Sequence, residues 1–303
     1  MNYGALGISL DSSDLPIFGS TLVYALIGDP IDHSLSPAIQ NAAFRSADLN
    51  AVYVAFTVPA ATLRSAVQGV RSLRVKGFNV TAPHKLAMLR CIDKVETEAA
   101  EIGSINTVKN DDGTLTGFDT DGVGALNAMD EAGISVDGQR VLLIGAGGAG
   151  RAIAYALAGR DCSLKLANRT VSSARRLAKS LRSNFGISAE SVALSRQPLR
   201  DSVKEADIIL NASSMGMDGS NNPPVDKRWI RGNHWVFDIV YRPVQTKLLR
   251  DATASGARTI NGLNMLVNQG ACSFTLWTGK KAPIREMRRA IGEKWMVENV
   301  ANR

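Results

Sequence analysis

Short apolar runs alternate with amphipathic stretches along most of the chain, and this pattern predicts an α/β protein. Buried parallel strands are written as short continuous apolar runs, whereas a helix repeats apolar residues every three or four positions. We therefore predict mainly parallel sheets covered by helices. The predicted strands are residues 22–27, 52–57, 77–80, 141–144, 163–167, 208–211, 235–240 and 258–260.

Helical patterns follow most of the predicted strands. Ser36 and Pro37 are expected as the N-cap and the first residue of a helix that runs to about residue 47. Pro83 can open another helix after the third strand. The remaining predicted helices are residues 60–73, 121–132, 152–158, 171–185, 264–278 and 283–298.

Two places depart from the alternation of strand and helix. Asp111, Asp112 and Gly113 lie between residues 107–109 and 114–118, and an Asp-Gly pair tolerates the positive φ angles of a hairpin turn. We expect an antiparallel insertion here. Near the end of the sequence, two helices follow each other with no strand between them. These helices need a neighbour to cover, and the first domain is one candidate.

Length and composition indicate two globular domains. The chain has 303 residues, of which 45% are apolar and 21% charged, and one domain usually holds roughly 100–200 residues. No apolar run approaches the roughly 18 residues that a membrane span needs. Residues 1–20 contain no Lys or Arg and no apolar core with a small-residue cleavage site. We therefore expect a cytoplasmic protein with no membrane partner.

The net charge leaves three kinds of partner open. The value of +7 fits a nucleic-acid surface, an anionic membrane, or a small acidic substrate or cofactor. The sequence has no aromatic-interleaved basic patch and no nucleic-acid-binding motif, so we expect no nucleic-acid partner. Cys91, Cys162 and Cys272 are far apart and lack metal-ligand spacing, which predicts reduced, buried thiols and no metal site.

The Gly-rich segment 145–150 is a candidate dinucleotide site. It fits G-x-G-x-x-G directly after a predicted strand and before a helix. In that context Gly145 makes the tight turn, Gly147 admits a pyrophosphate, and Gly150 lets the helix pack closely. Unpaired N–H groups at the helix start favour anions. The alternative is a Gly-rich turn that binds no ligand.

Residues 168–170, at the end of the next strand, favour NADP over NAD. An NAD site usually carries Asp or Glu near this point to bind the ribose hydroxyls. Arg169 can instead hold a 2′-phosphate, with Asn168 and Thr170 as neutral donors. An ordinary solvated charge at Arg169 is the alternative.

Polar residues follow the first and third predicted strands. Ser34 and Ser36 lie beside helix N–H groups, where two hydroxyls suit a carboxylate, although Ser36 alone is also a simple N-cap. Asn79, Thr81 and Lys85 follow the third strand, at the edge where open α/β sheets bind ligands. A lone Lys is usually a solvated charge, but these neighbours favour a functional site.

Taken together, the motifs resemble the shikimate dehydrogenase family, including its quinate/shikimate dehydrogenase branch. The resemblance runs from about residue 22 to residue 279. The motifs that carry it are Gly28-Asp-Pro-Ile-Asp-His-Ser34-Leu-Ser36-Pro37, Asn79-Val-Thr81-Ala-Pro-His-Lys85, Gly103-Ser-Ile-Asn106-Thr107, Thr120-Asp121-Gly122, residues 145–150, Asn168-Arg-Thr170 and Gly262-Leu-Asn-Met-Leu-Val-Asn-Gln269-Gly270. So many motifs in one order make a specific match.

The resemblance implies an NADP-dependent enzyme that reversibly reduces 3-dehydroshikimate to shikimate, in the pathway to chorismate and the aromatic amino acids. By matched position, Lys85 and Asp121 are the catalytic pair. The residues that match substrate positions are Ser34, Ser36 and Tyr241 for the carboxylate and Thr81, Asn106 and Gln269 for the hydroxyls. The residues that match cofactor positions are Gly145, Ala146, Gly147, Gly148, Ala149, Asn168, Arg169, Thr170, Ile239 and Gly262.

The family fold implies two α/β domains. A substrate-binding catalytic domain with a mainly parallel sheet is expected to comprise residues 1–121 and 263–303, and a Rossmann-like NADP-binding domain residues 122–262. The last two helices then return to the first domain, and the cleft between the domains is the active site. We expect a monomer or a homodimer.

Three positions depart from the family pattern. The family usually has Asn where this chain has Asp119, Gly where it has Asn264, and often a second Arg where it has Ser173. The Asp119 carboxylate either faces outward or shares the site with Asp121 and raises the pKa of its neighbour. The alternative functions are a quinate/shikimate dehydrogenase with broader substrate or NAD use, and a non-catalytic NADP-binding regulatory protein. The retained Lys85 and Asp121 argue against the latter.

Overall fold

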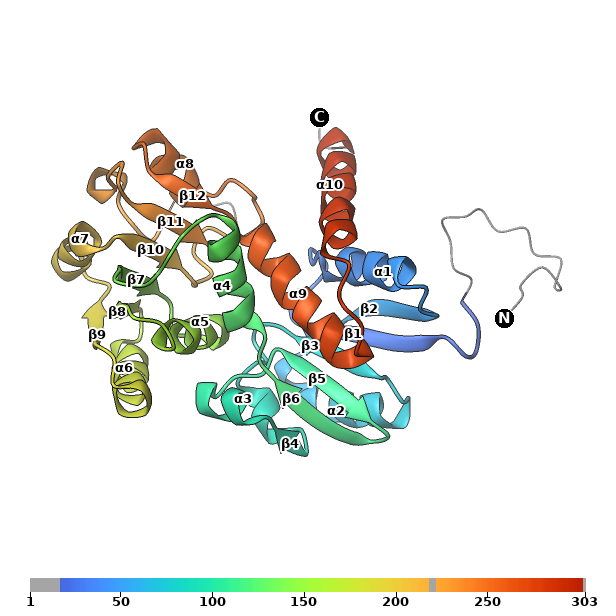
Figure 1. Ribbon diagram of the computed structural model, residues 1–303. Helices are drawn as coiled ribbons and strands as arrows, with labels where there is room; N and C mark the ends of the chain where they lie inside the picture. The colour runs from blue at the N-terminus through green and yellow to red at the C-terminus, as the bar shows by residue number, and fades with distance from the viewer. Residues whose placement is uncertain (1–16, 218–221, 302–303) are drawn as a thin grey trace.

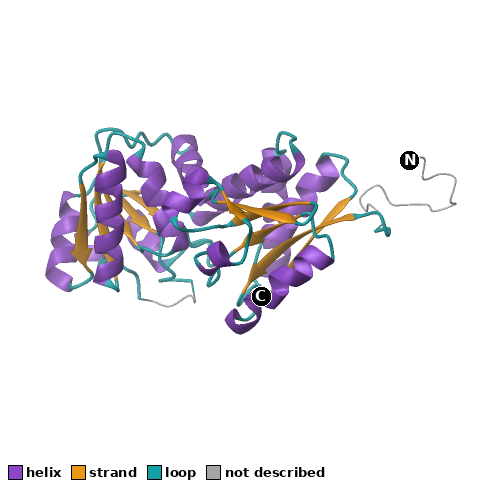
Figure 2. Cartoon of the chain, turned by 90° about the horizontal axis from the view of Figure 1, so that it is seen from below, coloured by secondary structure: helices purple, strands orange, loops and turns teal. Residues whose placement is uncertain are grey.

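Two six-stranded sheets form the frame of the molecule, and helices cover them (Figure 1). The computed structural model describes residues 17–217 and 222–301. Figure 2 shows the strands of each sheet enclosed between helices. The alternation of apolar runs and helical patterns thus predicts the α/β class correctly. None of the helices in the described ranges is long and apolar enough to cross a membrane.

The first sheet is mixed but mainly parallel, with strand order β2-β1-β3-β5-β6-β4. β1 pairs in parallel with β2 and β3, whereas the β5–β6 hairpin joins β3 in the antiparallel sense. At the hairpin turn, Asp112 and Gly113 have φ angles of 48° and 98°, as the Asp-Gly pair predicts. The strands are β1 (Leu22–Gly28), β2 (Ala51–Thr57), β3 (Gly77–Val80), β4 (Lys94–Val95), β5 (Thr107–Asp111) and β6 (Thr114–Phe118).

The second sheet is parallel throughout, with strand order β12-β11-β10-β7-β8-β9. The order reverses between β7 and β10, which is the doubly wound arrangement of a Rossmann-like domain. Ligands of such sheets bind outside the carboxyl ends of the strands at this switch point. The strands are β7 (Arg140–Ile144), β8 (Ser163–Asn168), β9 (Ala189–Ala193), β10 (Ile208–Asn211), β11 (Trp235–Asp238) and β12 (Arg258–Ile260).

Most of the helices connect successive strands and pack on the sheet faces. Those associated with the first sheet are α1 (Ser36–Ser46), α2 (Leu63–Ser72), α3 (Thr97–Ile102) and the 3-10 turns η2 (Ala60–Thr62) and η3 (Ala87–Arg90). Those associated with the second sheet are α5 (Gly148–Ala158), α6 (Val171–Phe185), α7 (Arg196–Glu205), η4 (Lys227–Trp229) and α8 (Lys247–Ala254). Three more helices link or cover the sheets, namely α4 (Asp121–Glu131), α9 (Gly262–Thr278) and α10 (Ile284–Ala301).

The helix α9 returns from the second sheet to the first, as the unpaired helical patterns suggest. In Figure 1 it lies between the two halves of the molecule, beside α4. Its Phe274 is fully buried against Phe44 of α1, with ring centroids 5.7 Å apart. Trp277 donates a hydrogen bond from Nε1 to the Val108 carbonyl at 3.0 Å. The first sheet is therefore completed by residues that come late in the chain.

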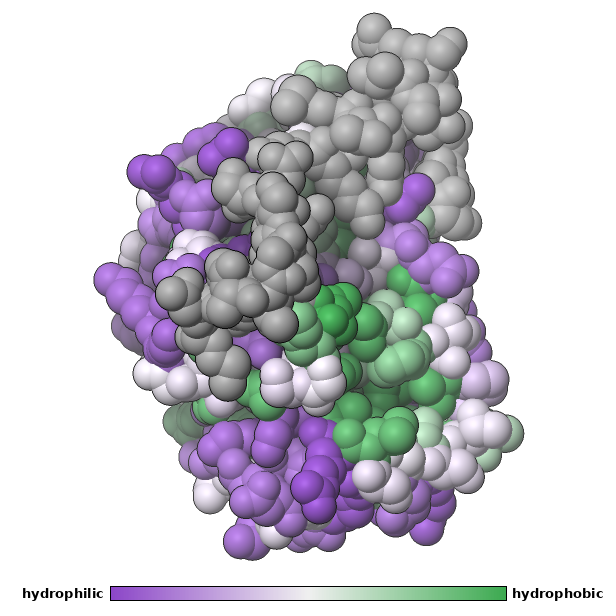
Figure 3. All heavy atoms as spheres, turned by 90° about the vertical axis from the view of Figure 1, so that its right-hand side faces the viewer, coloured by the Kyte–Doolittle hydropathy of each residue, from purple (hydrophilic) through white to green (hydrophobic). Residues whose placement is uncertain are grey.

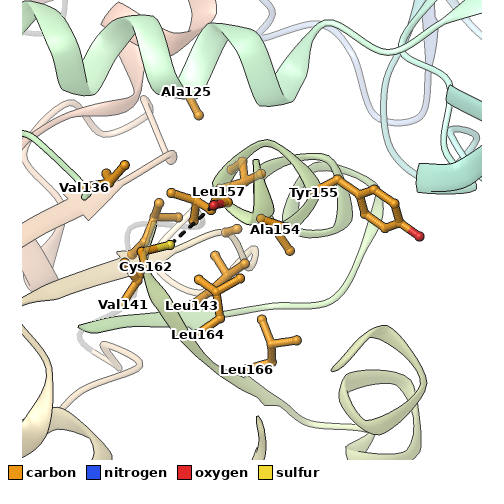
Figure 4. Packing of buried hydrophobic residues seen from close by; sticks show 14 of the residues in the cluster. Ala125, Val136, Val141, Leu143, Ala154, Tyr155, Leu157, Cys162, Leu164 and Leu166 are labelled. Carbon is orange, nitrogen blue, oxygen red and sulfur yellow. Dashed lines mark hydrogen bonds between the residues drawn. The ribbon is translucent and has the colours of Figure 1, made fainter. Parts of the chain in front are cut away.

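Apolar side chains fill both faces of the second sheet. Figure 4 shows one of these cores, where Leu143, Leu164 and Leu166 of the sheet face α5. Ala125 of α4 joins the same core. Cys162 also lies there, with its Sγ donating to the Leu157 carbonyl at 3.3 Å. The helix that leaves the first sheet is thereby anchored to the second.

Three local predictions are wrong at the level of single elements. Ser36 is not an N-cap but the first residue of α1, because the Ser34 hydroxyl accepts the Ser36 N–H at 3.2 Å in its place. Pro83 opens no α-helix. The segment forms only η3, because the Lys85 carbonyl accepts the N–H of Ile105 instead of a helical partner. The Gly-rich turn is also shorter than expected, since α5 begins at Gly148 rather than at residue 152.

The prediction of buried thiols holds for one cysteine. Cys162 is buried, whereas Cys91 and Cys272 are half-buried, and all three are free. Cys91 lies just after the short turn η3, where the surface is close. Cys272 lies on α9 among residues that alternate between the core and the surface.

Figure 3 shows one face of the first domain, on which apolar side chains gather beside strongly polar regions. Several large apolar residues in the described part of this domain are exposed, namely Ile17, Leu22, Phe56, Leu73 and Leu86. Exposed apolar residues are normal on a protein surface and identify no partner by themselves.

Candidate active site

One cavity of about 490 Å³ lies between the two sheets. It is bordered by the carboxyl ends of β1 and β3 on one side and of β7, β10 and β11 on the other, with α9 along its length. This volume suits a small organic ligand. The predicted site residues that line it are Ser34, Ser36, Thr81, Lys85, Asn106, Asp121, Gly147, Gly148, Ala149, Ile239, Tyr241, Gly262 and Gln269.

Lys85 and Asp121 form a direct ion pair at the edge of this cavity. The Lys85 Nζ donates to Oδ2 of Asp121, and the two side chains are 15% and 5% exposed. Burial alone lowers the pKa of Lys85, but the charges of Asp121 and Asp119 raise it, and the net effect is a pKa above the ordinary value. Lys85 is therefore a charged ammonium at neutral pH. The pair thus consists of a cation and an anion held out of bulk water.

A buried amide holds Asp121 in place from the other side. Asn106 donates from Nδ2 to Oδ1 of Asp121 at 2.8 Å and to the Thr120 hydroxyl at 2.9 Å. Its Oδ1 accepts the backbone N–H of Thr120 at 2.9 Å. The Gln269 Oε1, on α9, lies 3.4 Å from the same Nδ2. Both oxygens of the Asp121 carboxylate are therefore engaged, one by Lys85 and one by Asn106.

A second layer of polar side chains supports Asn106. Asn79 donates from Nδ2 to the hydroxyls of Thr107 at 3.0 Å and Ser273 at 2.9 Å, and it accepts from the Tyr53 hydroxyl at 2.8 Å. The Thr107 hydroxyl in turn donates to Oδ1 of Asn106 at 2.8 Å. Because these groups are buried and mutually bonded, they limit the movement of the amide that holds Asp121.

Sequence reasoning assigned no role to Ser273 or to Tyr53. Ser273 follows Gln269 by four residues, so the two lie on one face of α9, and that spacing is a signal that could have identified it. Tyr53 gives no such signal, because its hydroxyl reaches Asn79 only in the folded sheet, where β1 lies between β2 and β3. Ser213 and Met217, from the turn after β10, also line the cavity.

The three residues of the predicted carboxylate site lie near one another, since the Ser34 hydroxyl accepts the Ser36 N–H and also acts on the Tyr241 phenol. Ser34, Ser36 and Tyr241 all line the cavity, although Tyr241 comes from the loop after β11 in the other half of the molecule. Burial raises the pKa of the Tyr241 phenol, while the Ser34 hydroxyl and the charge of Lys85 oppose the rise. Tyr241 is therefore a neutral hydroxyl donor at physiological pH.

The Gly-rich loop has the geometry that a dinucleotide pyrophosphate needs. Gly145 has a φ of +113°, which L side chains rarely adopt. A Cβ on Gly150 would lie 2.2 Å from the Gly145 carbonyl, whereas one at Gly147 would meet nothing within 4 Å. The space beside Gly147 is thus open, and α5 starts at once with no side-chain cap on its first N–H groups. Those groups are free to bind an anion.

Asn168, the last residue of β8, has a structural role, whereas Arg169 after it makes no contact of that kind within the part of the chain that the structure describes. Asn168 accepts the Ala146 N–H at 3.2 Å and donates to the Thr170 carbonyl at 3.0 Å, so its amide braces the loop. Arg169 is exposed and makes no hydrogen bond or ion pair with the described residues. None of residues 168–170 lines the cavity itself. Arg169 is the guanidinium at this position that is free to bind an anion.

The three departures from the family pattern have defined positions, and Asn264 is half-buried in the first turn of α9. Asp119 does not face outward, since its Oδ1 accepts the Asp121 N–H at 2.9 Å and its Oδ2 is buried. The Ser173 hydroxyl accepts from Arg176 at 3.3 Å. Across the described residues, no group of three or more His, Cys, Asp or Glu side chains is arranged to hold a metal ion.

A doubly wound parallel sheet, a Gly-rich loop at its switch point and a buried ion pair at the edge of one cavity define a two-domain, dinucleotide-binding α/β protein of the dehydrogenase type. Three family models match the chain. The shikimate dehydrogenase substrate binding domain matches residues 26–108, the shikimate / quinate 5-dehydrogenase model residues 127–237, and the shikimate 5'-dehydrogenase C-terminal domain residues 262–291. The chain belongs to the shikimate dehydrogenase family.

Individual relatives agree over nearly the whole length. The shikimate dehydrogenase (NADP(+)) of Moorella thermoacetica is 44% identical and covers 92% of this chain and 95% of its own. That of Thermococcus kodakarensis is 46% identical and covers 89% and 96%. A crystal structure of shikimate dehydrogenase in complex with NADP+ is similar with a TM-score of 0.85 and 39% identity, and the match covers 92% of this chain and 97% of that one.

Proposed function

We propose that this chain is an NADP-dependent shikimate dehydrogenase that reversibly reduces 3-dehydroshikimate to shikimate, a step toward chorismate and the aromatic amino acids. The observation that carries the proposal is the buried Lys85–Asp121 pair, which lies on the cavity wall beside the Gly-rich loop. The family membership and the NADP-dependent relatives support the choice of substrate and cofactor. A regulatory protein without activity would not need this ion pair.

Lys85 is proposed to act as the acid in the reduction and as the base in the reverse direction. The dinucleotide, when bound, supplies the hydride to the ketone carbon. Negative charge then develops on the ketone oxygen, where a protonated Lys85 can stabilise it and donate a proton. Asp121 keeps the ammonium oriented and charged, since it binds Nζ directly.

Six side chains are proposed to hold the substrate ring. Ser34, Ser36 and Tyr241 offer hydroxyl donors for a carboxylate, and Thr81, Asn106 and Gln269 offer partners for the ring hydroxyls. The support for these roles is their position, because all six line the cavity that Lys85 and Asp121 also border. Lys85 adds a positive charge, which favours an anionic substrate.

The cofactor roles follow the shape of the second domain. The loop of Gly145, Ala146, Gly147, Gly148 and Ala149 is proposed to hold the pyrophosphate, although Gly145 and Ala146 do not themselves line the cavity. Ile239 and Gly262, which do line it, are proposed to contact the cofactor as well. Arg169 is proposed to bind the 2′-phosphate, supported by its exposure and its lack of partners in the described chain. Asn168 and Thr170 are proposed to complete that subsite.

Three further properties belong to the proposal. The domains are taken as residues 1–121 with 263–303 and residues 122–262, the protein as a monomer or a homodimer, and its location as the cytoplasm. Limited proteolysis tests the domain limits, because cleavage should concentrate between compact units. Light scattering after size exclusion gives the oligomeric state, and cell fractionation the location.

The function is tested by oxidising shikimate or quinate with NADP or NAD and following the absorbance of the reduced nicotinamide. We expect shikimate with NADP to give the highest kcat/KM. Comparable rates with quinate or with NAD would instead support the broader quinate/shikimate enzyme. No activity with either acid would overturn the enzyme assignment and leave a binding protein.

A further inference from the structure

A second carboxyl group lies behind the Lys85–Asp121 pair. Asp119 precedes Asp121 by two residues, and its Oδ1 accepts the Asp121 backbone N–H at 2.9 Å, at the first turn of α4. Its other oxygen, Oδ2, is buried and has no hydrogen-bond partner in the described structure. A buried carboxylate oxygen without a partner is costly, so this oxygen calls for an explanation in the chemistry of the site.

Ser104 lies at the same point and is also unpartnered. It is fully buried, and its hydroxyl makes no hydrogen bond to any described residue. A Cβ added to Gly148 would lie 2.9 Å from Oγ of Ser104 and 2.9 Å from Cδ of Lys85. Ser104 and Lys85 therefore meet at the start of α5, under the Gly-rich loop. The Ser104 hydroxyl and the Asp119 Oδ2 atom, neither of which has a hydrogen-bond partner among the described residues, are therefore both neighbours of the Lys85 ammonium.

The charged groups that act on Asp119 are Asp121 and Lys85. Burial, followed by the repulsion of the Asp121 carboxylate, raises the pKa of Asp119 to about 8, although the charge of Lys85 works in the opposite direction. Asp119 is in turn one of the charges that raise the pKa of Lys85. At neutral pH Asp119 is mostly a neutral acid, and it ionises as the pH rises past 8.

We propose that Asp119 is a third ionisable member of the Lys85–Asp121 cluster, a positioning residue whose first oxygen fixes the backbone of Asp121 and whose second oxygen, once ionised, keeps the Lys85 ammonium protonated. This inference rests on the proposed function of Lys85 as the acid. The Ser104 hydroxyl is one of the groups that act on the Asp119 carboxyl, so the two groups without partners lie next to each other.

The sign of the effect follows from the charges. With Asp119 neutral, the cluster holds one cation and one anion; with Asp119 ionised, it holds a second anion. An added negative charge favours the protonated form of a nearby amine. As the pH rises past 8, Asp119 therefore loses its proton first and delays the loss of the Lys85 proton. Ketone reduction, which needs the protonated Lys85, should then persist to higher pH.

The substitution Asp119→Asn isolates this charge. The amide keeps an oxygen for the Asp121 N–H and nearly the same shape, but it cannot ionise. We expect the alkaline limb of the kcat profile for 3-dehydroshikimate reduction to move down by about one pH unit. Asp130→Asn, at an exposed position late in the same helix, removes one negative charge, as Asp119→Asn does above pH 8, and should leave the limb in place.

A second readout needs no catalysis. Competitive labelling of lysines by acetic anhydride across pH, with mass spectrometry of the Lys85 peptide, reports the pKa of that amine in the full chain. Its midpoint should fall by about one pH unit in Asp119→Asn and stay unchanged in Asp130→Asn. If Asp119→Asn does not fold, Ser104→Ala serves instead. It removes a hydroxyl that favours the ionised Asp119, and the midpoint should fall by a smaller amount.

The outcomes separate the inference from the proposed function. An unchanged Lys85 midpoint in Asp119→Asn overturns the inference, and so does a shifted midpoint with an unmoved alkaline limb. If the wild-type protein reduces no 3-dehydroshikimate, the proposed function fails, and labelling alone decides whether Asp119 controls the charge of Lys85.

Discussion

Burial and neighbouring charge have opposite effects on the pKa of Lys85. Burial favours the neutral amine, whereas the carboxyl groups of Asp121 and Asp119 favour the ammonium, and the net result is a raised pKa. A charge held in this way needs no reorganisation when an oxyanion develops beside it. The cost of burying it is offset by the direct bond to Asp121, whose other oxygen is held by Asn106.

Lys85→Met tests the proposed acid directly. The methionine keeps much of the side-chain volume but removes the proton and the charge, so kcat for shikimate oxidation should fall by about a hundredfold or more. The dissociation constant of NADPH, measured by fluorescence quenching, should stay within about twofold, since no hydrogen bond to the cofactor is assigned to Lys85. Lys94→Met, at an exposed lysine of β4, is the matched control. A kcat within tenfold of wild type would contradict the role.

Arg169→Ala tests the basis of cofactor choice. Loss of a charge-assisted hydrogen bond to the 2′-phosphate should weaken NADP binding by about 10- to 100-fold, measured by calorimetry. NAD lacks that phosphate, so its dissociation constant should not change. Arg285→Ala, at an arginine 96% exposed on α10, should affect neither. Equal weakening of both dinucleotides would assign Arg169 a different role.

At the scale of residues, the sequence motifs predict which side chains lie in the site but not which hydrogen bonds they form with one another. Lys85, Asp121 and Asn106 can be picked out from their sequence context, and all three meet at the cavity. The bond from Asn106 to Asp121 spans the open end of the β5–β6 hairpin, so it depends on the register in which Thr107 faces Phe118, and the motifs do not specify that register. The roles given to the site residues stay predictions until the substitutions above are measured.

At the scale of elements, α9 has two tasks. It begins at Gly262 on the cavity wall, carries Gln269 beside Asn106, and ends with Phe274 and Trp277 in the core of the first sheet. One helix therefore positions Gln269, a candidate substrate-binding residue, and also buries two aromatic side chains. A shift of α9 would change both the cavity wall and the packing of the first sheet.

Phe274→Ala measures how strongly α9 is held. Phe274 is fully buried, so its truncation should lower the free energy of unfolding by about 3–5 kcal/mol in urea titrations. Phe56→Ala, at a phenylalanine 46% exposed on β2, should cost less than about 1 kcal/mol. Similar losses for both variants would mean that α9 packs less tightly than its contacts indicate.

Helices and strands are predicted correctly where the hydrophobic periodicity extends over many residues. They are missed where an element depends on pairing with a strand far away in the sequence. The basic amphipathic helix over residues 171–185 is found with the predicted limits as α6. The strand β4, of two residues, and the short helix α3 have no periodicity to detect, and β4 exists because it pairs with β6. The helix over residues 83 onward is lost because Lys85 uses its carbonyl for Ile105.

At the scale of the whole molecule, the two halves share a core. Ile102 at the end of α3 and Ala125 of α4 belong to the same apolar cluster as Val141 and Leu143 of the second sheet. Arg151 of α5 also donates from Nε to the Ile102 carbonyl at 2.6 Å. The two halves are therefore joined by a shared apolar cluster and by a hydrogen bond, and not by linker segments alone.

Because of this shared core, we expect differential scanning calorimetry to show one cooperative transition, with equal calorimetric and van't Hoff enthalpies. Phe274→Ala should move that transition to lower temperature without splitting it. Two separate transitions in the wild-type protein would show that the halves unfold independently, and the cluster around Ile102 would then contribute little to their coupling.

The return of α9 also orders events during synthesis. Tyr24 and Phe44 lie in the first domain, and their rings pack against Trp277 and Phe274, which leave the ribosome only after the entire second sheet. Chains fold from the N-terminus as they emerge. The aromatic rings of Tyr24 and Phe44 therefore lack their packing partners until the second domain has been synthesised. A chaperone that binds exposed aromatic side chains would act during that interval.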